Sequence, residues 1–192
     1  MLVQQEIHEP FVQELARRTA RLRLGAGLDD PDVGPIISEE QFQRVLKYLE
    51  VGKEERAEIV AGGTPATEVS LRQGFFVKPT LFDAVQPHIR IAQEKIFGQV
   101  LSILPFRDVE EAVEIANGVS YGLVTAIWTR DIGKAHRLAA QIKAGQVFIN
   151  NYFGGRVATP FGGYKKSGFG REKDIEALLS YTQVKNVCVM LD

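Results

Sequence analysis

The sequence predicts an α/β fold with a mainly parallel, twisted sheet and flanking helices. The first observation is an alternation of apolar strand-like runs with amphipathic helical runs from residue 99 onward. The joints between these runs are short, which is typical of βαβ units with parallel strands and right-handed crossovers. The second observation is the run GLVTAIW (122–128), which lacks the alternation expected of a strand with one face in water. Both favour a sheet covered on its two faces.

The first 56 residues predict two helices separated by a loop. Ile7, Phe11, Leu15 and Leu22 fall on one helical face and are expected to be buried. Glycine, proline and aspartate dominate residues 25–35, which are therefore predicted to be a loop.

The second helix has a start signal in its sequence. Ser38 is a good N-cap and Gln41 stands at the third helical position, which is a capping-box pattern. Phe42, Val45 and Leu49 belong to its expected buried stripe.

Two strands are expected between this helix and residue 99. AEIVAGG (57–63) predicts a short strand that ends at its two glycines. FFVKPTLFDAV (75–85) predicts extended structure, but Pro79 argues against a central position in a sheet there because proline cannot donate to the ladder.

The regular second half can be read element by element. QVLSILPF (99–106) predicts a strand, and Asp108 is expected to cap the helix that follows. After the strand at 122–128, Asp131 is expected to cap a second helix, and QVFIN (146–150) predicts the third strand. The last stretch, LLSYTQVKNVCVMLD, alternates like a strand with no helix after it. Such a strand would either close the chain's own sheet or pair with another chain.

Composition excludes several classes of protein. The net charge is −1, so the chain offers no broad attraction to nucleic acid or to an anionic membrane, and no apolar run is long enough to span a bilayer. One cysteine, Cys188, rules out an internal disulfide framework and fits a reducing, cytoplasmic location. The three histidines are scattered, so no metal site is expected.

The glycine-rich stretch PFGGYKKSGFGRE (160–172) is the first candidate site. Gly163 and Gly168 have the spacing of a phosphate-binding loop, but Phe169 and Gly170 stand where such a loop needs lysine and serine or threonine. We therefore interpret the stretch as a loop whose glycines allow positive φ angles and close backbone packing.

Cys188 is the second candidate. It lies in the alternating terminal stretch, with no histidine near it in sequence. An inert strand residue is favoured over a nucleophile, and no serine–histidine–aspartate or cysteine–histidine spacing is present.

Three stretches in order carry a family resemblance: GPIISEEQF (34–42), QEKIFGQV (93–100) and NNYFGGRVATPFGGYKKSGFGRE (150–172). With them, the chain from LVQQEIHEPF to YTQVKNVCVML resembles the C-terminal part of the NAD(P)-dependent aldehyde dehydrogenases. The resemblance implies a twisted α/β catalytic domain over residues 1–179 and an oligomerisation strand over residues 180–192. Self-association is expected through residues 181–190, with no nucleic-acid or membrane partner.

The resemblance also implies a mechanism. A cysteine thiolate attacks an aldehyde, hydride passes to the nicotinamide of NAD or NADP, and an activated water releases the acid. The family's nucleophile would lie a few residues before the segment that matches LVQQ, and its general base and nucleotide-binding domain would lie further upstream. The isolated chain is therefore expected to be inactive, as the C-terminal portion of such an enzyme. A non-catalytic association module and a half-enzyme completed by a separate N-terminal chain are the alternatives.

The cofactor residues implied by the resemblance lie in QEKIFGQV and in the second helix. The family typically has Glu-Ile-Phe-Gly-Pro here, so Phe97 matches a residue beside the nicotinamide, while Lys95 and Gln99 depart from the glutamate and the proline. A lysine has no acceptor for ribose hydroxyls, which leaves Glu94 as a substitute only if the backbone turns differently. Gln41 matches a glutamine near the same ribose, although the capping box explains it equally well.

The resemblance also places a variable substrate loop at NYFGGRVATP. Because that loop varies with substrate in the family, the aldehyde is not specified. Arg156 could meet an acidic substrate, but a solvated loop arginine is favoured.

Overall fold

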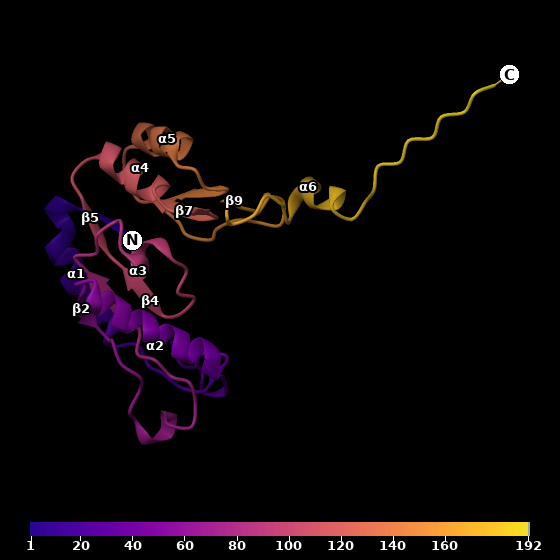
Figure 1. The fold of residues 1–192 in the computed structure, drawn as a ribbon. Helices are drawn as coiled ribbons and strands as arrows, with labels where there is room; N and C mark the ends of the chain where they lie inside the picture. Colours follow the sequence, from indigo (N-terminus) through magenta and orange to yellow (C-terminus); the bar gives the residue numbers. More distant parts are fainter. Residues whose placement is uncertain (192) are drawn as a thin grey trace. The chain divides into compact units, whose positions relative to one another are not determined.

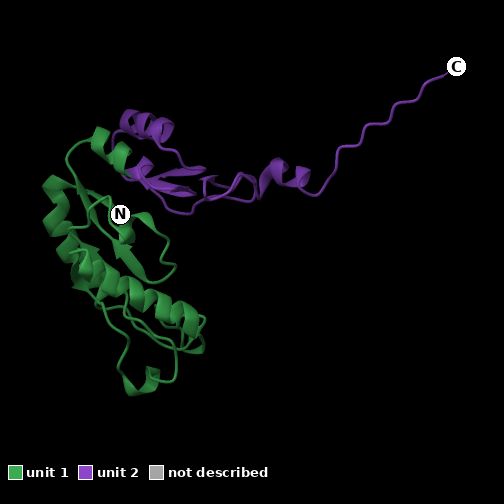
Figure 2. Cartoon of the chain, in the orientation of Figure 1, with its two compact units in different colours: residues 1–115 green, residues 116–192 purple. Residues whose placement is uncertain are grey.

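The computed structural model describes residues 1–191, which form two compact units that meet between residues 115 and 116 (Figure 2). Unit 1 contains the helices and strands of Figure 1 up to the start of α4: β1 Leu2–Gln4, α1 Gln5–Thr19, α2 Glu39–Glu54, β2 Glu58–Ala61, β3 Thr80–Asp83, α3 Arg90–Gln93, β4 Val100–Ser102 and β5 Leu104–Phe106. Short 3-10 turns, η1 Gly27–Asp29 and η2 Val69–Leu71, lie in its loops.

The remaining elements begin at the boundary between the units. They are α4 Val109–Asn117, β6 Tyr121–Gly122, β7 Val124–Ile127, α5 Ile132–Gln141, β8 Gln146–Ile149, β9 Tyr164–Lys165 and α6 Asp174–Leu179. The α/β class is confirmed: β7 and β8 pair in parallel with α5 between them, which is a βαβ unit, and β3–β4 and β1–β5 are also parallel pairs.

The sheet of unit 1 is covered by a helix on each face. Its order is β2-β3-β4, and neighbouring residues of β3 enter different apolar clusters. Phe82 packs with α2 residues such as Val45 and Leu49, whereas Leu81 packs with Val12 of α1. Because successive strand side chains point to opposite faces, the two helices lie on opposite sides of the sheet.

Two expectations about this sheet are wrong. β3 is the central strand, although it begins directly after Pro79; the proline lies outside the ladder and so removes no hydrogen bond from it. The run 99–106 is two strands instead of one, since β4 pairs with β3 while β5 pairs with β1. Ile103, between them, is fully buried and donates its N–H to Phe82.

The expected buried face of the first helix is correct only at Leu15. Ile7, Phe11 and Leu22 are exposed, and the residues that face the core are Val12, Leu15 and Ala16. The side of α1 that faces the core is determined by its contacts with β3 and Ile103, and the helical pattern of the sequence alone does not predict these contacts. The stripe expected for α2 is confirmed, with Val45 and Leu49 at its centre.

Helix starts follow their sequence signals. The side chains of Ser38 and Asp131 accept from the backbone N–H groups of Gln41 and Lys134, and Asp108 accepts from Glu111 in the same way. These bonds satisfy N–H groups that a helix start otherwise leaves without partners.

The C-terminal stretch does not form its expected strand within this chain. Residues 183–191 carry no strand pairing in the described structure and run as an extended, exposed segment after α6 (Figure 2). Pairing with another chain, and the division at residues 179 and 180, stay predictions. Among residues 1–191, the helices are all too short or too polar to cross a membrane.

Candidate functional site

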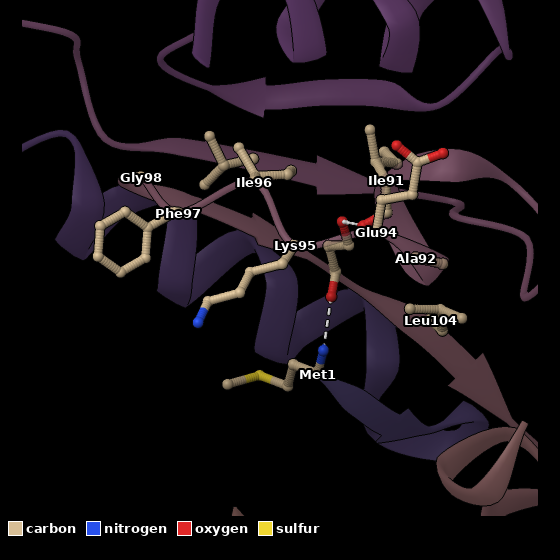
Figure 3. Close-up of a pocket in the computed structure, with 11 residues that line it drawn as sticks. Met1, Ile91, Ala92, Glu94, Lys95, Ile96, Phe97, Gly98 and Leu104 are labelled. Carbon is tan, nitrogen blue, oxygen red and sulfur yellow. Dashed lines mark hydrogen bonds between the residues drawn. The ribbon is translucent and has the colours of Figure 1, made fainter. Parts of the chain in front are cut away.

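The loop of residues 94–98 joins α3 to β4 and borders a pocket of about 610 Å³ (Figure 3). Ile96 points into the core, whereas the side chain of Phe97 is 69% exposed. Phe97 has a φ of 61°, a left-handed conformation that costs a non-glycine residue about 1–2 kcal/mol. The pocket is lined by Met1, Ile91, Ala92, Glu94, Lys95, Ile96, Phe97, Gly98, Val100, Ser102 and Leu104.

Glu94 stands at the start of the loop and is already engaged by two side chains. Its Oε2 accepts from the Tyr48 hydroxyl at 2.6 Å, and Arg90 donates to both of its oxygens at 2.9 and 3.1 Å. The Arg90 guanidinium, followed by the Tyr48 hydroxyl, lowers the pKa of Glu94 to about 2. The carboxylate is therefore ionised at neutral pH and held by its own neighbours.

Gln41 uses its backbone and its side chain for different purposes. Its backbone N–H donates to the Ser38 hydroxyl at 3.2 Å, which is the first half of the capping box. Its side-chain amide does not complete the box and instead donates to the carbonyls of Ile96 and Phe97, at 3.0 and 2.8 Å. The capping box therefore does not account for this glutamine side chain.

Lys95 and Gln99 occupy the two positions that depart from the family pattern. The ammonium of Lys95 lies 5.2 Å from the centre of the Phe97 ring, within the range of a cation–π contact. The backbone carbonyl of Gln99 accepts from the N–H of Thr80, and its side-chain amide lies 3.5 Å from the carbonyl of Gly34. Gln99 therefore ties the end of the loop to the sheet.

The glycine-rich stretch is a closely packed loop, as interpreted from the sequence. A guanidinium nitrogen of Arg171 donates to the carbonyls of Gly163, Phe169 and Gly170, at 3.0, 3.3 and 2.9 Å. The loop therefore turns carbonyl oxygens inward, whereas a phosphate site needs N–H groups. Gly168 has a φ of 101°, which glycine adopts without strain.

The stretch matched to the substrate loop carries an aromatic group. Phe153 lies 5.4 to 6.3 Å, ring centre to ring centre, from Tyr152, Phe161 and Phe148. Arg156 is exposed, as a solvated arginine would be, and Cys188 is exposed in the terminal segment.

Comparison with known proteins decides the family. The model of the aldehyde dehydrogenase family matches residues 1–187. The chain belongs to the aldehyde dehydrogenase family. Relatives include betaine aldehyde dehydrogenase of Bacillus subtilis, 43% identical over 97% of this chain and 38% of that protein. Another is 4-trimethylaminobutyraldehyde dehydrogenase of Sus scrofa, 40% identical over 98% of this chain and 39% of that protein.

Solved aldehyde dehydrogenases share the fold closely. The NAD+ complex of the Bacillus cereus enzyme has a TM-score of 0.92 at 44% identity, and covers 100% of this chain and 38% of that one. The NAD+ complex of Staphylococcus aureus betaine aldehyde dehydrogenase has a TM-score of 0.92 at 40% identity, over 94% of this chain and 36% of that one. The chain thus spans less than two fifths of the length of these relatives.

The residues present fit a nicotinamide cofactor only in part. Phe97 is exposed beside a pocket and can offer a ring face to a planar group. Ribose hydroxyls need acceptors; Lys95 offers donors only, and Glu94 already accepts three hydrogen bonds from Tyr48 and Arg90. The cofactor contacts expected of Phe97, Glu94 and Gln41 stay predictions.

Sequence reasoning missed two residues of this site, Tyr48 and Arg90. The spacing of four between Arg90 and Glu94 could have signalled their pairing, because residues four apart are neighbours on a helix. No local pattern signals Tyr48, which is 46 residues from Glu94 in sequence.

Proposed function

We propose that this chain forms part of an NAD-dependent aldehyde dehydrogenase that oxidises an aldehyde to a carboxylic acid. The observation that carries the proposal is the family match over residues 1–187, together with the likeness to two solved NAD+ complexes. We propose that the loop with Phe97 contacts the nicotinamide and that the stretch NYFGGRVATP (151–160) contacts the substrate. The single cysteine supports a reducing, cytoplasmic location.

The family's reaction needs a reactive thiolate, and we propose that residues 1–192 do not supply one. Aldehyde oxidation by this family's reaction needs a thiolate to form a thiohemiacetal, and a cofactor to accept the hydride. Within these residues the one cysteine is Cys188, in the exposed terminal segment. We therefore propose that the 192-residue polypeptide, taken by itself, does not oxidise aldehydes.

Titration with NAD+ tests the cofactor part of this proposal. Because Lys95 replaces the family's glutamate and Glu94 is already held by Tyr48 and Arg90, the 192-residue polypeptide should bind NAD+ with a dissociation constant of about 1 mM or weaker. Isothermal calorimetry measures it directly, with Phe97→Ala as the variant expected to weaken binding further and Phe169→Ala as a matched control. Micromolar binding would show that the site is complete without further residues.

We also propose that residues 181–190 mediate self-association. The terminal segment is exposed and carries these uncovered apolar side chains: Tyr181, Val184, Val187, Val189, Met190 and Leu191. An extended segment with unpaired backbone groups can add to the sheet of another chain. The same observation favours a non-catalytic association module as the second candidate function.

A substitution in this segment tests the association. Val187→Asp places a charge in the apolar row and should shift an assembly at about 10 μM toward monomer, because burying an unpaired carboxylate is costly. Lys185→Asp changes a polar position of the same segment and serves as the control. Sedimentation velocity measures both, and an unchanged mass for Val187→Asp would remove residues 181–190 from the interface.

A further inference from the structure

The backbone of loop 94–98 is held by one face of α2. Gln41 donates to the carbonyls of Ile96 and Phe97, and Arg44 donates to the carbonyl of Lys95 at 2.9 Å. Three successive carbonyls are thus bound by two side chains that are neighbours on the helix. The backbone of this exposed loop is therefore held by side chains from a segment about 50 residues earlier in the sequence.

Apolar packing adds a second restraint on the same face. Val45 of α2 is fully buried, and a Cβ atom built on Gly98 would lie 2.5 Å from its Cγ2. Ile96, the one apolar loop side chain turned inward, is 8% exposed and belongs to the same cluster. The loop therefore meets α2 closely at its backbone.

Tyr48 joins the start of the loop to the same helix. Its hydroxyl donates to Glu94, and the guanidinium groups of Arg44 and Arg90 lie over its ring at 5.5 and 5.6 Å. Arg90 holds the other side of Glu94. The loop is therefore bound to α2 through the Glu94 carboxylate and through the backbone carbonyls of Lys95, Ile96 and Phe97.

These hydrogen bonds and packing contacts account for the strained backbone conformation of Phe97. A left-handed φ in a bulky residue persists only where the surroundings over-determine it. The Phe97 side chain is exposed, and its ring lies beside Lys95 at the pocket (Figure 3).

We propose that Gln41, Arg44 and Tyr48 are positioning residues that hold Phe97 in place for the cofactor. The functional part rests on the proposed aldehyde dehydrogenase function. Gln41 acts through the N–H groups of its side chain, which donate to the carbonyls of Ile96 and Phe97.

Two variants of Gln41 test its role in positioning the loop. Gln41→Leu removes both donors, and Gln41→Glu keeps the shape and adds an acceptor but also has no donor. If Gln41 positions the loop, both variants should raise the rate of tryptic cleavage after Lys95 about tenfold, because two hydrogen bonds are lost. Gln43→Leu, at an exposed position of the same helix, should leave the rate unchanged.

A spectroscopic signature distinguishes positioning from general loss of structure. With 4-fluorophenylalanine at Phe97, the ¹⁹F shift should move in both Gln41 variants and stay in place in Gln43→Leu, at equal thermal midpoints. An unmoved ¹⁹F shift in Gln41→Leu would overturn the proposal, and so would cleavage that rises equally at sites throughout the chain.

A nucleotide arm tests the function separately. At about 10 mM NAD+, the ¹⁹F signal of the unsubstituted chain should shift, and the shift should shrink in Gln41→Glu despite its new acceptor. A larger shift in Gln41→Glu would make Gln41 a direct ligand and overturn its positioning role. The ¹⁹F signal of the unsubstituted chain could stay unchanged with NAD+ while the Gln41 variants still speed cleavage after Lys95. That result would support the contacts between α2 and the loop but count against the cofactor function.

Discussion

Replacing Phe82 with alanine is expected to lower the free energy of unfolding of unit 1 by about 3–5 kcal/mol. Phe82 is 0% exposed on the central strand of the sheet, and its ring contacts α2 so closely that a Cβ on Gly52 would lie 2.6 Å from it. Removing the ring leaves a cavity between sheet and helix that neither can collapse to fill. Urea unfolding followed by far-UV circular dichroism measures the loss.

The matched control is Phe169→Ala. Phe169 is 98% exposed, so the same substitution should change stability by no more than about 0.5 kcal/mol. Equal effects at the two phenylalanines would mean that Phe82 does not lie in the core described here.

Gly145→Ala should have the second largest effect, of about 3 kcal/mol on unit 2. A Cβ at Gly145 would overlap the carbonyl oxygen of Gly162, and its own N–H donates to the carbonyl of Gly122 at 3.0 Å. Both contacts are made by backbone, which cannot rotate aside as a side chain can. The fluorescence of Trp128, the only tryptophan in the chain, follows the unfolding of this unit.

Gly170→Ala provides the comparison in the same glycine-rich loop. Nothing lies within 4 Å of a Cβ built at Gly170, and its φ is not in the left-handed region, so stability should fall by less than about 1 kcal/mol. A Gly170 variant as unstable as the Gly145 variant would contradict the packing described for this loop.

Local signals in the sequence were reliable for the helix starts. Ser38, Asp108 and Asp131 each accept the expected backbone bond, because a cap involves residues only two or three positions apart. The run 99–106 shows where local signals end. Its two halves pair with different strands, and strand pairing depends on partners as distant as residue 2.

The candidate site could be located from sequence, but the roles of its residues could not. Phe97 lies beside a pocket, in the stretch that resembles a nicotinamide site. The cofactor contacts expected of Glu94 and Gln41 stay predictions, and in the structure their side chains hold parts of this chain. Which partners a carboxylate or an amide binds depends on distant residues such as Tyr48, and sequence spacing does not predict such contacts.

In the proposed function, residues 1–192 supply a loop for the cofactor and a loop for the substrate of an aldehyde dehydrogenase, but not its nucleophile. The most direct test is NADH formation, followed by absorbance, with the purified 192-residue polypeptide, NAD+ and betaine aldehyde or other aldehydes, beside its Cys188→Ser variant. We expect no NADH above the buffer rate for either protein. Turnover by the unsubstituted polypeptide that disappears in Cys188→Ser would make Cys188 the nucleophile and overturn the proposed inactivity of the isolated polypeptide.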